Sequence, residues 1–345
     1  SKTGEGLDDL QRALAELAGQ GEEHPVHGLL RLPIDRVFTL RGHGTIVTGT
    51  LISGTINVGD DVIILPAGRT SSVRSLQSHN QKEEQAFPGE RVAVNLRGLE
   101  HSDLHRGEVV THPGEFHSSH VVDVRLSVLA RSPLALKTRQ KVRLHHYTSE
   151  VEAKVILPDC EALEPGEETL AQLRTLSPIV PSAGDRFVIR ALSPSVTLGG
   201  GVILNPRATK LKARTVQGFA ELDQDDQEGI VAALIKSAGL EGCGRRVLLG
   251  LSGLPAKGLD RIVEKLRNSQ TVTRFDPVED RLIHRDFVLL LKKKILDRLQ
   301  AFHADHPLQE GMPKQELRST VPGGDKLFKK VIEILEGSGE LIDQG

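Results

Sequence analysis

The segment of residues 42–60 constrains the fold of this chain more than any other feature. It reads GHGTIVTGTLISGTINVGD, so β-branched residues lie between glycines at the spacing of tight turns. Valine, isoleucine and threonine favour the pleated surface of a strand, and glycine supplies the positive φ that hairpins and bulges require. The segment therefore predicts the corner of a small β-barrel.

Short apolar runs separated by turn residues continue to about residue 113, and a second region of this kind begins near Ser119. The runs at 62–65 and 92–96 have the length and composition of buried strands. The second region ends in three glycines, 199–201, where we expect a bulge or a barrel corner. A phosphate-binding loop is the alternative there, but it would need a helix after the glycines, and strand residues follow instead. The chain is thus predicted to hold two successive β-barrels.

After Arg207 the apolar residues recur with the period of helices. The expected elements are a helix over 227–238, a short helix, turn and second helix over 251–266, and strands at 271–275 and 281–284. Helix, helix-turn-helix and hairpin in this order predict a winged helix. The plan then repeats, with helices over 286–302 and 326–335 and residues 339–342 in place of a complete second wing.

Composition bounds the class of protein. With 345 residues, the chain is long enough for several domains with their own cores. Its two cysteines, Cys160 and Cys243, show no metal-ligand spacing, which favours a disulfide-free fold in a reducing compartment. No apolar run reaches the roughly 18 residues of a membrane-spanning helix, and no signal pattern opens the chain. We therefore expect a cytoplasmic protein without membrane contact.

The N-terminal residues Thr-Gly-Glu-Gly, at 3–6, precede four leucines at helical spacing. This spacing predicts an amphipathic helix over about residues 7–17, for which a flexible cap before the helix is the plain interpretation. The sequence contains no phosphate loop of the form Gly-x-x-x-x-Gly-Lys-Ser/Thr. We therefore expect that this chain alone neither binds nor hydrolyses GTP.

The barrel segment at 42–60 resembles the second domain of the translational GTPases, the family of elongation factor Tu. Two barrels followed by tandem winged helices resemble, more specifically, the bacterial selenocysteine-specific elongation factors over essentially the whole chain. The motifs that carry this resemblance are DRFVIR at 185–190, Ser193-Pro194, the triple glycine, and the PL, GMPK and ELR runs within 307–318. The resemblance implies a multidomain β plus α fold.

The implied parts are the tail of a GTPase domain at 1–22, a domain 2 β-barrel at 23–115, a domain 3 β-barrel at 116–208, and winged helices at 209–285 and 286–345. The first part would retain Ser1 and Lys2 from the last guanine-contacting loop. The resemblance further implies binding of selenocysteinyl-tRNA and its delivery to ribosomes at recoded UGA codons, with GTP and Mg in the complete protein. It implies a monomer, and contact with the messenger insertion element through C-terminal modules that this chain lacks.

The resemblance also places the pocket for the selenocysteinyl group at Asp35, Arg36 and Arg91, with His43 as a possible neighbour. A selenol is largely ionised at neutral pH, so a guanidinium favours it over the neutral hydroxyl of serine, by roughly 1.5 to 3 kcal/mol. The plain alternative is a strand-edge salt bridge worth under about 1 kcal/mol, with His43 as a solvent-facing turn residue.

Local basic clusters are the candidates for contact with RNA phosphates. They are Lys210, Lys212 and Arg214; Arg245 and Arg246; and Lys292, Lys293 and Lys294. A solvated helix face is the alternative for each cluster. The chain has one tyrosine and no tryptophan, so base stacking on aromatic side chains is not expected as the main mode.

Two further interpretations concern metals and function. Three histidine pairs have spacings that a metal could use in a helix, but no other ligands accompany them, so we expect no metal site. They are His101 with His105, His117 with His120, and His303 with His306. The chain shows no catalytic nucleophile motif. A nucleic-acid-binding or scaffold protein without aminoacyl specificity remains the alternative function.

Overall fold

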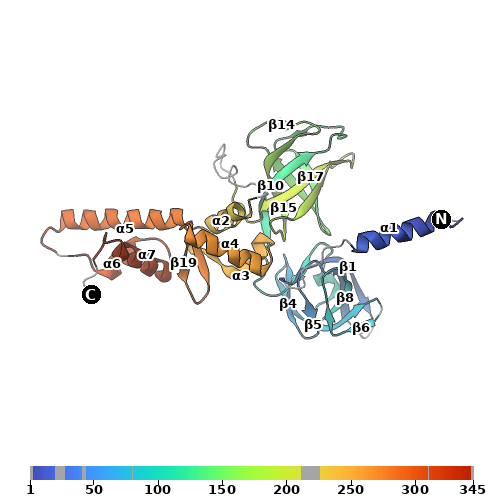
Figure 1. The fold of residues 1–345 in the computed structure, drawn as a ribbon, viewed down its shortest axis with the longest axis horizontal. Helices are drawn as coiled ribbons and strands as arrows, with labels where there is room; N and C mark the ends of the chain where they lie inside the picture. Colours follow the sequence, from blue (N-terminus) through green and yellow to red (C-terminus); the bar gives the residue numbers. More distant parts are fainter. Residues whose placement is uncertain are drawn as a thin grey trace.

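The structure is a computed structural model that describes residues 3–19, 28–40, 44–79, 81–210, 226–309 and 311–342. Figure 1 shows two β-barrels close together and an arm of helices that extends away from them. None of the described helices is long and apolar enough to cross a membrane. The predicted combination of barrels and winged helices is confirmed.

The first barrel is a closed antiparallel ring in the order β4-β9-β1-β2-β8-β5, and a pairing of β5 with β4 completes the ring. Its strands are β1 (Leu32–Leu40), β2 (Gly44–Thr50), β4 (Asp61–Leu65), β5 (Arg69–Ser78), β8 (Arg91–Leu96) and β9 (Val109–Thr111). Strand β6 (Gln81–Glu83) pairs antiparallel with the end of β5, and β3 (Ile56–Asn57) pairs with β7 (Gln85–Ala86). Leu32, Ile34, Val47 and Val94 are among the buried residues that fill the ring.

The second barrel closes in the order β10-β15-β13-β12-β16-β17. Its strands are β10 (Ser119–Val128), β12 (Lys141–His146), β13 (Ser149–Ile156), β15 (Glu168–Ile179), β16 (Arg186–Arg190) and β17 (Thr197–Asn205). A small pair, β11 (Leu136–Lys137) with β14 (Ala162–Leu163), lies outside this ring. Residues of β12 alternate between exposed and buried, as the sequence pattern predicted.

The three glycines lie inside β17 rather than at the bulge or corner that we expected. Each is paired in regular register with both neighbouring strands, and register shifts occur only on either side of the run. A Cβ at Gly201 would lie 1.9 Å from the carbonyl oxygen of Arg125, and one at Gly200 would lie 2.4 Å from that of Phe187. Close approach of three strands therefore requires the glycines.

The first winged helix consists of α2 (Gln227–Ser237), β18 (Cys243–Gly244), α3 (Arg245–Ser252), α4 (Ala256–Asn268), β19 (Val272–Asp276) and β20 (Arg281–His284), with a short η3 turn (Gly239–Glu241) after α2. Its sheet has the order β18-β20-β19. The predicted helix-turn-helix is present, but its first helix begins at Arg245, six residues before the predicted start. Gly253, with a φ of 65°, ends this helix, so the buried Leu248 and Leu251 lie within it.

The second helical unit contains α5 (Arg285–Asp305), α6 (Lys314–Thr320) and α7 (Asp325–Gly337). Residues 339–342, which we placed at a second wing, form no strand. Ile283 and Phe275 from the hairpin of the first winged helix pack into the core of this second unit. Lys326 Nζ lies 2.6 Å from Asp276 Oδ2 at the same contact. The two helical units are thus joined through a shared core.

The predicted N-terminal helix is present as α1 (Leu7–Gly19). Its four leucines are between 53% and 64% exposed, and Figure 1 shows the helix standing apart from the barrels. In globular proteins the apolar face of an amphipathic helix usually packs against another part of the protein, and the leucine face of α1 is exposed in this structure.

A buried ion pair joins the two barrels. Arg31, before β1, donates from Nη1 and Nη2 to both oxygens of Asp185, at 2.8 and 2.6 Å, and from Nη2 to the carbonyl of Val180. Its guanidinium lies between the rings of Phe116 and Tyr147, 5.2 and 4.7 Å from their centroids. Burial by itself would raise the pKa of the Asp185 carboxyl, but the charge and hydrogen bonds of Arg31, together with those of His146, lower it well below its usual range. The two-pronged contact of Arg31 with Asp185 and its packing against the two rings together fix the relative orientation of the two barrels.

The first winged helix is docked against both barrels through α3. Ser182 Oγ donates to the carbonyl of Gly250 at 2.6 Å, and the Ala183 amide donates to that of Leu251 at 2.8 Å. A Cβ at Gly250 would lie 1.9 Å from the Glu115 carbonyl oxygen. The contact is therefore a backbone-to-backbone approach that only glycine permits.

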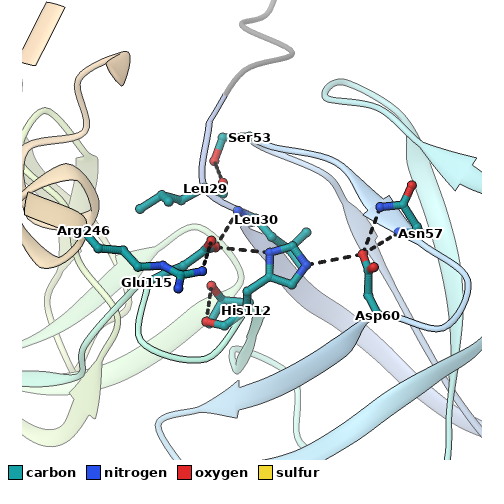
Figure 2. A network of polar contacts seen from close by, with 9 residues as sticks. Leu29, Leu30, Ser53, Asn57, Asp60, His112, Glu115 and Arg246 are labelled. Atoms are coloured by element: carbon teal, nitrogen blue, oxygen red, sulfur yellow. Dashed lines mark hydrogen bonds and ion pairs between the residues drawn. The ribbon is translucent and has the colours of Figure 1, made fainter. Parts of the chain in front are cut away.

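Figure 2 shows a polar network beside this contact. The Glu115 carboxylate accepts from the Leu30 amide at 2.9 Å and lies 3.5 Å from His112 Nδ1 and 3.4 Å from Arg246 Nη2. The other ring nitrogen of His112, Nε2, lies 3.3 Å from Asp60 Oδ2. Hydrogen bonding to Glu115 raises the pKa of His112. The network thus connects the first barrel to α3.

Candidate functional site

A β-bulge places the candidate pocket on the outside of the first barrel. Ile34 pairs with Gly49 and Arg36 pairs with Thr48, so Asp35 is an extra residue in β1 without a partner in β2. Gly49 makes this possible, because a Cβ there would lie 2.2 Å from the Pro33 carbonyl oxygen. The bulge therefore depends on a glycine opposite it.

The structure brings Asp35 and Arg91 together as a two-pronged ion pair. Arg91 Nη1 lies 2.7 Å from Asp35 Oδ2, and Arg91 Nη2 donates to Oδ1 at 3.1 Å. The hydroxyl of Thr48 donates to Oδ1 at 2.7 Å. The Asp35 side chain is 21% exposed and that of Arg91 is 54% exposed, so water screens the pair and its contribution to stability is small.

Arg36 lies on the same face of the sheet, but it has no ion-pair partner among the described residues. Directly paired residues in a sheet share a face, so Arg36 lies beside Thr48, and Arg91 lies beside Thr50, two residues further along β2. Arg36 is exposed and, within the part of the chain that the structure describes, makes no ion pair. One carboxylate and two guanidinium groups give the cluster a net positive charge. Such a cluster suits an anionic ligand group.

Several predicted residues lie outside the described residues. They are Ser1, Lys2, His43, Lys212 and Arg214. Lys210 is described and exposed.

The other predicted RNA contacts fall into two groups. Arg245 is held by Asp260, with Nε and Nη2 at 2.6 and 2.7 Å from the two carboxylate oxygens. Arg246 Nη2 lies 3.4 Å from Glu115 Oε1, and Lys292 Nζ lies 2.7 Å from Glu340 Oε1. Lys293 and Lys294 are exposed on α5 and, in residues 226–309 and 311–342, have no such partner. Three of these five side chains are therefore held in intramolecular ion pairs.

Thr48 was not among the predicted site residues, because only the bulge in β1 brings Asp35 to its hydroxyl. Arg31 and Glu115 were given no role either, because Arg31 pairs with the distant Asp185 and Glu115 contacts the distant Leu30 and Arg246 in addition to the nearby His112. Among the described residues, no group of three or more histidine, cysteine, aspartate or glutamate side chains is arranged to hold a metal ion.

Comparison with known families matches three parts of the chain. Residues 44–111 match elongation factor Tu domain 2, residues 123–210 match the β-barrel domain of selenocysteine-specific elongation factor, and residues 296–345 match the winged helix of elongation factor SelB. A selenocysteine-specific elongation factor of Desulfomicrobium baculatum is 37% identical over 344 residues, which is 99% of this chain and 54% of that protein. The chain is homologous to the selenocysteine-specific elongation factors.

Other relatives agree with this assignment. The selenocysteine-specific elongation factor of Escherichia coli is 30% identical over 98% of this chain and 52% of its own length. A crystal structure of bacterial selenocysteine-specific elongation factor EF-Sec has the same fold, with a TM-score of 0.77 and 23% identity over 97% of this chain and 52% of that chain. The chain spans about half the length of the curated relatives it matches.

Proposed function

We propose that this chain is the tRNA-binding part of a selenocysteine-specific elongation factor, and that the cluster of Asp35, Arg36 and Arg91 recognises the selenocysteinyl group. The observation that carries the proposal is an exposed Arg36 beside Asp35, whose two carboxylate oxygens are both engaged by Arg91. The homology to factors named for selenocysteine supports it.

The chemistry of the cluster fits the discrimination that such a factor needs. A selenol loses its proton near neutral pH and presents a selenolate, whereas the hydroxyl of serine stays neutral. A guanidinium contact with the anion is worth roughly 1.5 to 3 kcal/mol, which corresponds to about a ten- to hundredfold preference.

The remaining parts of the proposal concern the whole factor. We infer that residues 1–22 end a GTPase domain, whose surface would cover the leucines of α1, and that the boundaries at 115, 208 and 285 separate the later domains. GTP and Mg would bind to that GTPase domain, because the residues of a phosphate loop do not occur in this sequence. The ribosome, and a messenger insertion element read by further C-terminal modules, are the other partners proposed for a monomeric, cytoplasmic factor.

Binding to three forms of one tRNA tests the proposal. Selenocysteinyl-tRNA, seryl-tRNA and uncharged tRNA are titrated at fixed salt against this chain joined to a GTPase domain in the presence of GTP. A preference for selenocysteinyl-tRNA supports the proposal. Equal and salt-sensitive binding of all three would instead indicate a scaffold with a basic surface, because a general RNA binder does not read the amino acid.

A further inference from the structure

The two arginines of the candidate pocket are not equivalent. Arg91 is bound by both oxygens of Asp35, so its positive charge is largely balanced. Arg36 follows Asp35 directly in the chain, is exposed, and makes no ion pair with the described residues. Only Arg36 therefore offers an unbalanced charge to a ligand.

The bulge puts the carboxylate within reach of both arginines. In a regular strand Asp35 and Arg36 would point to opposite faces. Here Thr48 is paired with Arg36 and shares its face, and the same Thr48 donates to Asp35 at 2.7 Å. The side chains of Asp35 and Arg36 are therefore on one face, and a carboxylate released from Arg91 would neutralise Arg36 or repel an anion there.

We propose that Arg36 alone contacts the selenolate, and that Arg91 and Thr48 are positioning residues that hold the Asp35 carboxylate away from Arg36. The division of roles rests on the proposed function. Arg91 contributes to selectivity through Asp35 and makes no contact with the selenium atom. The hydroxyl of Thr48 fixes one carboxylate oxygen, so that both prongs of Arg91 stay engaged.

Suppression by a second substitution tests this division of roles. The measured quantity is selectivity, the ratio of the dissociation constants of seryl-tRNA and selenocysteinyl-tRNA, in the full-length factor with GTP. Arg91→Ala is expected to lower selectivity roughly tenfold, since it leaves Asp35 uncompensated. The double variant Asp35→Ala/Arg91→Ala is expected to restore selectivity to within about threefold of the unsubstituted protein, because the harmful carboxylate is gone. If Arg91 contacts the selenolate itself, the double variant stays as poor as Arg91→Ala, and the division of roles is wrong.

Thr48 provides an independent test. Thr48→Val removes the hydroxyl and keeps the β-branched shape, and it is expected to lower selectivity by about two- to tenfold, while Thr48→Ser keeps it. A loss of affinity for both tRNAs without a change in selectivity would assign Thr48 a structural role only and would contradict the proposal. Arg97→Ala, which removes another exposed guanidinium from the same barrel, is the matched control and should leave selectivity unchanged.

The two hypotheses fail in different ways. If Arg36→Ala leaves selectivity unchanged, the proposed function fails at this site. If Arg36→Ala abolishes selectivity but the double variant does not recover it, the pocket stands and the positioning roles of Arg91 and Thr48 are refuted. All these side chains are partly or fully exposed, so the variants are expected to fold, and circular dichroism checks this.

Discussion

Replacing Gly250 with alanine should destabilise the protein, although alanine usually stabilises the interior of a helix relative to glycine. Alanine is favoured over glycine by about 1 kcal/mol in helix interiors. At Gly250, however, the new Cβ would lie 1.9 Å from the Glu115 carbonyl oxygen and 3.3 Å from Leu29 Cδ1. The first of these atoms is backbone and has no rotamer to change, so α3 must move away from the barrels.

The cost follows from the contacts that such a movement weakens. They are the hydrogen bonds from Ser182 Oγ to Gly250 and from the Ala183 amide to Leu251. Each is worth about 0.5–1.5 kcal/mol, and overpacking costs typically 1–3 kcal/mol. After the gain in helix propensity, we expect a net loss of roughly 1–5 kcal/mol, which lowers the melting temperature by several degrees.

Differential scanning calorimetry of matched variants is the assay. Gly258→Ala is the control, because a Cβ there meets nothing closer than Pro255 Cδ at 3.9 Å, and it should melt at or above the temperature of the unsubstituted protein. The docking of α3 as described is refuted if Gly250→Ala is as stable as Gly258→Ala.

Three further predictions concern buried or half-buried groups. Arg31→Met should cost roughly 3–5 kcal/mol, seen as a lower urea midpoint, because it removes the guanidinium that balances the buried Asp185 carboxylate and leaves that carboxylate with hydrogen bonds from His146, Tyr147 and Ser182 alone; an unchanged midpoint would contradict this. His112 has a raised pKa through Glu115, so its stabilisation is complete below the unfolded value of 6.5 and is lost as pH rises through the folded pKa. The melting-temperature difference between the unsubstituted protein and His112→Gln should therefore be larger at pH 5.5 than at pH 8.5, and a difference independent of pH opposes the assignment. Burial raises the pKa of Cys243 to about 11, so a thiol reagent at pH 8 should modify Cys160 first, and equal rates would argue against the packing around Cys243.

The barrels and winged helices were predictable because their signals are local. β-branched residues between turn glycines in 42–60 and the period of 3.6 in 227–238 each depend on neighbouring residues only. The triple glycine shows the limit of such signals. Its composition indicated close backbone contact, but its place inside β17 depends on pairing with β10 and β16, which no local pattern encodes.

The geometry of the candidate site could not be predicted from the sequence. The resemblance placed Asp35, Arg36 and Arg91 in one pocket, and the structure joins Asp35 to Arg91. The bulge at Asp35 depends on the register of β1 with β2, which tertiary packing sets. The Arg31–Asp185 pair spans 154 positions of the chain, and for the same reason no spacing in the sequence indicates it.

The most direct test of the central claim is the selectivity of Arg36→Ala for selenocysteinyl-tRNA over seryl-tRNA, measured with the full-length factor, GTP and fixed salt. Loss of a guanidinium that binds a selenolate predicts a fall in selectivity of about ten- to hundredfold, with the affinity for seryl-tRNA almost unchanged. Equal weakening of both complexes, or no change in either, would contradict the claim that this cluster reads the amino acid.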